Sequence, residues 1–222
     1  MMKKKSKNMM FNVFIGVLTA VIISWLGFGR ILQNGSGGGY GGGGDEINSP
    51  INAIENLVVE GSGHYLKANK QIQELLNLVE LQDLQGIDFN ELRQTVDSAL
   101  YHMNRAEETY RQLIRKAEIT PYNEPVIAKL KAFDYSSFMQ QNGLNAAVFN
   151  EVESYLANGD ITGIYKRSHS RFLDIIDMLN KIKEDTAGDK MPDLSIFWRL
   201  NETCAEMSLF GSYTARVFHT IL

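Results

Sequence analysis

The 222-residue chain contains few of the residues that crosslink a fold or interrupt helices. It has one cysteine, Cys204, which excludes an intrachain disulfide and leaves stabilisation to the packed core. No alternation of apolar and polar residues bounded by hairpin turns occurs, which argues against β-strands. The four prolines fall where helices are expected to begin or to be separated: Pro50, Pro121, Pro125 and Pro192.

The sequence also lacks the motifs of common catalytic and cofactor sites. No glutamate lies three residues before any of the four histidines, as a di-iron bundle requires, and zinc-type Cys and His spacings are absent. There is no Cys-x-x-Cys-His haem motif, nucleophile elbow, phosphate loop or dinucleotide fingerprint. We therefore predict a non-enzymatic protein with no cofactor or metal. A noncovalent b-type haem stays an alternative, with these possible ligands: His64, His102, Met103, Met207 and His219.

The first 44 residues contain five basic residues and no acidic residue. Four lysines precede an uncharged run from Asn8 to Gly29, which is long enough to cross a hydrocarbon core of about 30 Å. The excess of basic residues before this run predicts a cytoplasmic N-terminus and an extracytoplasmic C-terminal domain. The residues expected to anchor the chain in the bilayer are Phe11, Val13, Phe14, Ile15, Val17, Leu18, Val21, Ile22, Ile23, Trp25 and Leu26.

Four segments follow from this pattern. Residues 1–7 are expected to be a basic cytoplasmic N-terminus, and residues 8–30 a transmembrane or signal-anchor helix. Residues 31–48 are glycine-rich and typical of a flexible linker, and residues 49–222 are expected to form an extracytoplasmic domain. Two alternatives stay open for the apolar run: a signal peptide cleaved near Gly29, or a buried helix of a soluble protein.

The chain beyond residue 44 is strongly acidic, because it holds all 26 acidic residues and 17 of the 22 basic ones. Such a domain would be repelled by nucleic acid, so nucleic-acid binding is disfavoured. An acidic domain behind a single-pass anchor favours the bacterial inner membrane, with the domain facing the periplasm.

Apolar or small residues recur at alternating spacings of three and four in four long segments. The helices are expected to begin at Pro50, Asp88, Asp160 and Asp193, and the last of them to run to the end of the chain. Such a pattern is typical of helices that pack along a left-handed bundle seam. We predict an all-α fold: an antiparallel bundle of four long helices, with a shorter helical pair inserted between the second and third. The pair is expected at residues 125–133 and 145–156.

Several local features carry two interpretations. Gly61 and Gly63 either allow a neighbouring helix to approach closely or open a kink beside a pocket lined by His64, Tyr65, His102 and Tyr110. A basic cluster is either a solvated face paired with acidic residues of a neighbouring helix or a site for an acidic partner or anion: Lys166, Arg167, His169 and Arg171. The mixed charges from Arg105 to Glu118 are expected to be a solvated face, and Cys204 a buried thiol.

Two functions fit these features. The first is a single-pass accessory subunit that interacts with other membrane or cell-envelope proteins. The second is an exported ligand-binding or sensory bundle, which would be soluble if the N-terminal segment is cleaved and could hold a small molecule or haem in the candidate pocket.

Overall fold

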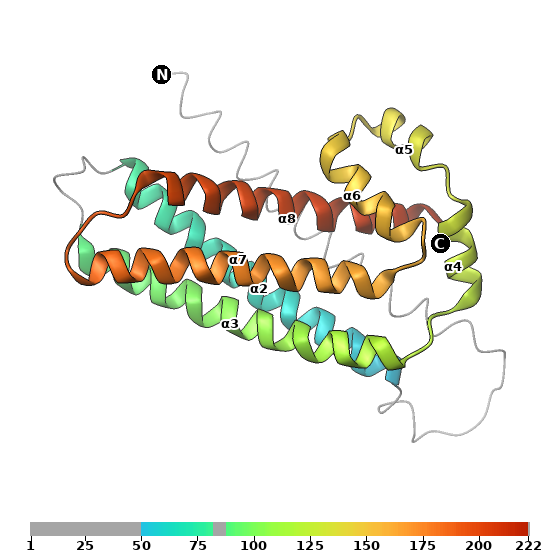
Figure 1. Ribbon diagram of the computed structural model, residues 1–222, viewed down its shortest axis with the longest axis horizontal. Helices are drawn as coiled ribbons and strands as arrows, with labels where there is room; N and C mark the ends of the chain where they lie inside the picture. The colour runs from blue at the N-terminus through green and yellow to red at the C-terminus, as the bar shows by residue number, and fades with distance from the viewer. Residues whose placement is uncertain (1–49, 82–87, 222) are drawn as a thin grey trace. The chain divides into compact units, whose positions relative to one another are not determined.

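The computed structural model describes residues 50–81 and 88–221, which form an all-α helical bundle with seven helices and no strand (Figure 1). The all-α prediction is confirmed for this part of the chain. Four of its helices are long: α2 (Pro50–Leu81), α3 (Phe89–Ile119), α7 (Ile161–Ala187) and α8 (Leu194–Ile221). Three are short: α4 (Glu124–Ala132), α5 (Tyr135–Asn142) and α6 (Ala146–Leu156).

The segments predicted at residues 1–7, 8–30 and 31–48 lie outside the described residues. In the part that the structure does describe, no helix is long and apolar enough to cross a membrane.

The chain divides into two compact units. Among the described residues, unit 1 comprises 50–59, 116–164 and 208–221, and unit 2 comprises 60–81, 88–115 and 165–207. Each unit is considered separately below.

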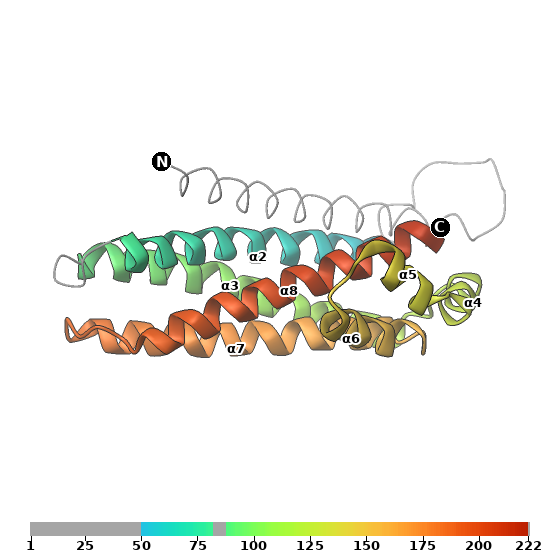
Figure 2. The same cartoon turned by 90° about the horizontal axis from the view of Figure 1, so that it is seen from above.

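Unit 2 contains segments of the four long helices, which lie alongside one another in Figures 1 and 2. Their predicted seams are confirmed as core, because seam residues such as Ile72, Leu92 and Leu179 are completely buried. Burial of side chains at this repeat removes one continuous apolar stripe per helix from water, which is the main force that holds such helices together.

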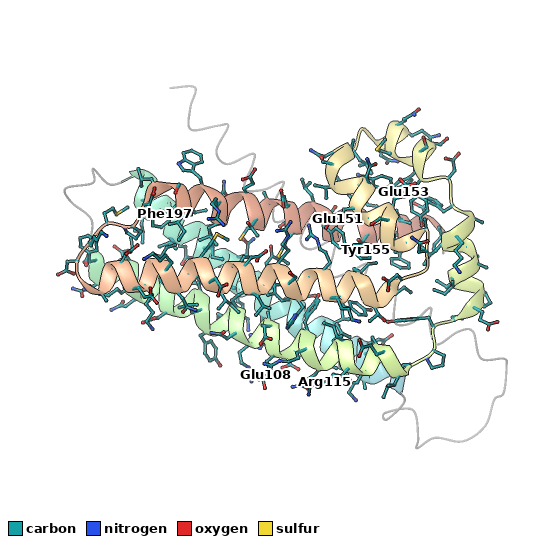
Figure 3. All side chains as sticks on the ribbon, viewed as in Figure 1. Glu108, Arg115, Glu151, Glu153, Tyr155 and Phe197 are labelled. Carbon is teal, nitrogen blue, oxygen red and sulfur yellow. The ribbon has the colours of Figure 1, made fainter. Side chains whose placement is uncertain are left out.

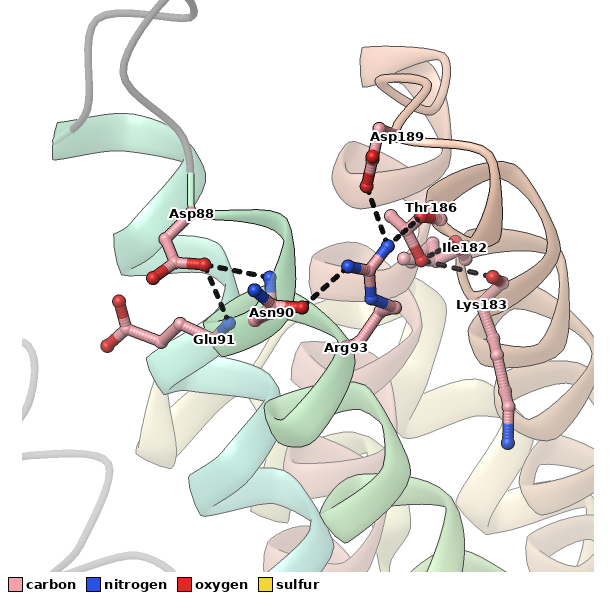
Figure 4. Close-up of polar contacts among 8 residues, drawn as sticks. All are labelled: Asp88, Asn90, Glu91, Arg93, Ile182, Lys183, Thr186 and Asp189. Atoms are coloured by element: carbon pink, nitrogen blue, oxygen red, sulfur yellow. Dashed lines mark hydrogen bonds and ion pairs between the residues drawn. The ribbon is translucent and has the colours of Figure 1, made fainter.

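Polar side chains connect α3 to α7 in unit 2 (Figure 4). Arg93 donates to the Thr186 carbonyl at 2.6 Å and to the Asp189 carboxylate at 2.8 Å, where α7 ends. Further along, Lys183 pairs with Asp97 at 2.7 Å. Because these partners occur in reverse order on the two helices, α3 and α7 run in opposite directions in unit 2.

The start of α3 follows the expected capping pattern. One carboxylate oxygen of Asp88 accepts the backbone N–H groups of Asn90 at 2.8 Å and Glu91 at 3.3 Å (Figure 4). These N–H groups have no partner within the helix, so the aspartate supplies the missing acceptor. The predicted beginning of this helix is confirmed.

Unit 1 contains the three short helices, and α5 was not predicted. This helix ends at Asn142, and Gly143 after it adopts a left-handed φ of 58°. The start of α5 is set by Asp134, whose carboxylate accepts the Ser137 N–H at 2.9 Å. The prediction of two inserted short helices is therefore wrong by one helix, because Asp134 caps a third.

Aromatic rings form the centre of unit 1. Phe149 on α6 is completely buried and lies near the rings of Tyr135, Phe138 and Tyr213, with ring centroids about 6 Å from it. On the same helix, Tyr155 packs edge-on against Phe210 at 6.2 Å, and Figure 3 labels Tyr155 with its neighbours Glu151 and Glu153. These rings join α5, α6 and the last part of α8.

Candidate functional site

Two of the predicted pocket residues meet on unit 2. His64 of α2 and His102 of α3 face each other with their Nδ1 atoms 3.3 Å apart. Their ring centroids are 5.5 Å apart, and the ring of Tyr101 stands edge-on to His102 at 5.1 Å. Both histidines are partly exposed, and Tyr101 is 62% exposed. We call this group the histidine pair.

The surroundings of the histidine pair favour neutral imidazoles. Desolvation lowers the pKa of both histidines. The positive charge of Lys67 lowers the pKa of both further, and Arg105 lowers that of His64, while the carboxylate of Glu60 opposes the shift at His64. A neutral imidazole has one donor and one acceptor nitrogen, so one ring can donate its Nδ1 proton to the other.

The other two predicted pocket residues lie in the core of unit 2. Tyr65 donates its hydroxyl hydrogen to the Cys204 carbonyl at 3.3 Å, and the Tyr110 hydroxyl lies 3.3 Å from the Ser62 hydroxyl. Both tyrosine rings pack on Phe172, with centroid distances of 5.5 Å and 4.9 Å. Burial raises the pKa of Tyr110, with a smaller opposing effect from the bond with Ser62. The four predicted residues thus divide into a surface pair and a core pair.

Gly61 explains how Tyr110 fits into this core. A Cβ atom at Gly61 would lie 2.7 Å from two ring carbons of Tyr110, so the glycine permits the close approach that was one of the two interpretations. A Cβ atom at Gly63 would have nothing within 4 Å, so this glycine is not needed for the close approach of a neighbouring helix.

The predicted basic cluster on α7 does not form one continuous face. Lys166 is exposed, whereas Arg167 is buried. Nε2 of His169 lies 2.8 Å from a carboxylate oxygen of Glu107, and Arg171 lies 3.5 Å from Glu206 and 3.2 Å from Asp174. His169 and Arg171 are therefore paired with acidic residues of neighbouring helices, which is the pairing that one of the two interpretations describes.

Glu107 is a residue whose role the sequence reasoning missed. It was assigned to a solvated face, yet its side chain is only 14% exposed and its carboxylate contacts both His169 and Arg111. Figure 3 labels Glu108 and Arg115 on the same helix, and both of these are exposed, as predicted. His169 lies 62 residues from Glu107 in the sequence, so no local pattern could reveal this contact.

Cys204 is completely buried, which confirms the predicted buried thiol, and burial raises its pKa to about 12. The two methionines considered as haem ligands, Met103 and Met207, are also buried on the core seams. Within residues 50–81 and 88–221, no three potential metal-ligating side chains gather in one place.

A different feature appears at the start of α8 in unit 2. Phe197, labelled in Figure 3, is buried, but its neighbour Trp198 is 68% exposed. Leu194 lies one helical turn before Trp198 and is 42% exposed. We call these two residues the tryptophan patch; the sequence reasoning had not singled them out.

Comparisons of the chain with protein-family models, curated proteins and solved structures found no match.

Proposed function

We propose that this chain is a membrane-tethered, non-enzymatic interaction module of a cell-envelope complex. In this proposal residues 8–30 anchor the chain with its N-terminus in the cytoplasm, and the glycine-rich tether presents the bundle on the extracytoplasmic side, in a bacterium the periplasm. The four long helices form an antiparallel bundle, and its surface binds another envelope or membrane protein.

The exposed Trp198 is the observation that carries this proposal. A tryptophan that is 68% exposed leaves a large apolar ring in water, and Leu194 extends the apolar surface along the same face of α8. Tryptophan is enriched among the few interface residues that supply most of the binding free energy. The tryptophan patch is therefore the part of unit 2 that we assign to partner contact.

Co-purification of the full-length chain from native membranes after mild crosslinking tests this assignment. Truncation of an interface hot-spot residue costs at least about 2 kcal/mol, so Trp198→Ser should reduce the recovery of a specific partner by more than about tenfold. Leu173→Ser is the control, because Leu173 is also an exposed apolar residue of unit 2, at 43%, but lies on α7. Equal recovery with wild type and Trp198→Ser, or no specific partner at all, would contradict the proposal.

The anchor is tested separately by the mass and membrane association of the mature protein. A retained anchor gives a chain of full mass that resists extraction by salt or alkali and is cut by protease added outside the membrane. A product that begins near Gly29 and is released in soluble form would show that the segment is a cleaved signal peptide.

A ligand-binding or sensory role is the second candidate. The observation that favours it is the histidine pair, which places two neutral, partly exposed imidazoles in contact. Visible absorbance or an added mass in natively purified protein would support this role over simple protein binding.

A further inference from the structure

The histidine pair has the spacing of two neighbouring ligands of a tetrahedral metal ion. Zinc–nitrogen bonds of about 2.0–2.1 Å at a tetrahedral angle place the two nitrogens about 3.3–3.4 Å apart. A square-planar ion with adjacent nitrogens at similar bond lengths needs about 2.9 Å. The Nδ1 atoms of His64 and His102 are 3.3 Å apart, which matches the tetrahedral arrangement.

We infer that His64 and His102 form a surface site for one divalent first-row transition-metal ion, with Zn²⁺ as the best geometric match. The ion would bind both Nδ1 atoms and so connect α2 to α3. This site goes beyond the proposed interaction function and does not depend on it.

The chemistry of the pair allows a metal ion to replace the proton that the two rings share. In the metal-free pair, one ring donates its Nδ1 proton and the other accepts it. When an ion binds, the donor ring changes to its other neutral tautomer: Nδ1 gives its proton to water and Nε2 takes one up from water, so both ligands stay neutral and no net proton is released. The two rings are held on helices, and rotation about χ2 of histidine, which has a broad range, aims both lone pairs at one ion.

The charged groups around the pair favour moderate affinity. Glu60 lies one turn before His64 and contributes a negative charge, whereas Lys67 and Arg105 contribute positive charges that oppose a cation. The described residues contain no group of three potential ligands, so water completes the coordination. A two-histidine site of this kind is open and exchangeable, unlike the four-ligand sites that hold structural zinc.

His169 offers a contrast on the same unit. Its Nε2 faces the carboxylate of Glu107, and that carboxylate also binds Arg111, so the oxygen atoms are already neutralised by hydrogen-bond donors. The inference therefore rests on the histidine pair alone.

Titration of the untagged full-length protein with ZnCl₂ and with CoCl₂, each as the sole added metal, tests the site. We expect one equivalent to bind to wild type with a dissociation constant below 1 mM. Either His64→Gln or His102→Gln should weaken binding at least tenfold. The matched control is His219→Gln, because His219 is an exposed histidine of unit 1 and lies outside the pair.

Two further measurements do not depend on substitution. A bound Co²⁺ ion in a tetrahedral site gives an intense visible absorption band, whereas octahedral Co²⁺ gives a weak one. An ion that connects two helices of the folded state also raises the midpoint of thermal unfolding, by roughly 5 °C at a hundredfold excess over the dissociation constant. Wild type and His219→Gln should show both effects.

Several results would overturn the inference. They are a dissociation constant above 1 mM for both ions, binding that both His64→Gln and His102→Gln leave unchanged, and an octahedral Co²⁺ spectrum without a thermal shift. Circular dichroism of each variant confirms that the helices are intact. None of these results bears on partner recovery with Trp198→Ser, so the two proposals fail independently.

Discussion

Unit 2 and unit 1 are stabilised by different kinds of contact. In unit 2, side chains reach from one long helix to another: Arg93 to the end of α7, Asp97 to Lys183, and Glu107 to His169. In unit 1, the short helices α5 and α6 have side-chain caps at their starts, made by Asp134 and Asn145. The long helices are thus linked by polar side-chain contacts along their length, whereas the short helices α5 and α6 have polar contacts at their ends.

The difference follows from helix length. A helix of eight to eleven residues is marginal by itself in water, so its ends need specific partners. Asn145 illustrates this at α6: its side chain accepts the Val148 N–H at 3.2 Å, and its own N–H donates to the Tyr213 hydroxyl at 3.0 Å. A long helix buries an apolar stripe over many turns, so the loss of one end contact matters less.

The largest expected effect compares the aromatic centres of the two units. Phe149→Ala in unit 1 and Phe172→Ala in unit 2 each remove a buried ring that contacts other rings, and each should lower the free energy of unfolding by about 3–5 kcal/mol. Urea unfolding followed by circular dichroism measures this loss. A cost below about 1 kcal/mol for Phe149→Ala would show that the ring cluster does not hold unit 1.

Amide hydrogen exchange shows which helices each of these two substitutions destabilises first. Phe149→Ala should reduce amide protection first in α5 and α6, because those helices are joined through this ring. Phe172→Ala should reduce it first in the parts of α2 and α3 around Tyr65 and Tyr110. The reverse pattern would contradict the assignment of these rings to separate cores.

The second prediction compares two glycines on α2 in unit 2. Gly61→Ala introduces a methyl group 2.7 Å from the Tyr110 ring, and such overpacking costs about 1–3 kcal/mol. Gly63→Ala meets nothing within 4 Å and should instead raise the free energy of unfolding by about 0.5–1 kcal/mol, because alanine is the better helix former. Equal effects of the two substitutions in chemical denaturation would contradict the close approach at Gly61.

The long helices of both units could be predicted because a helix with one buried face has apolar residues at a regular spacing in the sequence. The expected starts at Pro50, Asp88, Asp160 and Asp193 agree with the observed helix bounds to within about one residue. A seam shows which face of a helix is buried without showing which residue of another helix lies opposite. That is why Tyr65 and His64, adjacent in sequence, were assigned to one pocket and in fact face different surroundings.

The short helices and the surface features were harder to predict for a different reason. The cap at Asp134 was visible in the sequence and was overlooked, so α5 was missed. By contrast, the contacts between Glu107 and His169 depend on the register between two helices, which only tertiary packing sets. The exposure of Trp198 likewise depends on what packs nearby, and a single apolar residue beside a seam gives no signal of it.

The third prediction compares a contact between helices with a cap. Arg93→Ala removes charge-assisted bonds to the Thr186 carbonyl and to Asp189, and should cost about 1–2 kcal/mol because the arginine is largely shielded while Asp189 is exposed. Asn145→Ala removes the cap of α6 and should cost about 1 kcal/mol. Thermal unfolding of both variants measures the difference, and Arg93→Lys controls for charge. A larger cost for Asn145→Ala would reverse the proposed ranking of the two kinds of contact.

The smallest expected effect is the pH dependence contributed by the histidine pair. The pKa of each histidine is lowered from 6.5 in the folded state, so below pH 6.5 the unfolded state binds more protons than the folded state. The free energy of unfolding should therefore fall as the pH is lowered from about 7 towards 5. Burial disfavours the charged form of both rings, Lys67 repels a proton on either ring, and His64 repels a proton on His102.

The double substitution of His64 and His102 by glutamine isolates this contribution. Midpoints of thermal unfolding at pH 7.5, 6.5 and 5.5 should decline less in the double variant than in wild type, while His219→Gln should follow wild type. Glu60 opposes the shift at His64, so Glu60→Gln should make the decline of the wild-type pair steeper. A double variant that declines as steeply as wild type would show that the two histidines do not have the lowered pKa values on which this prediction rests.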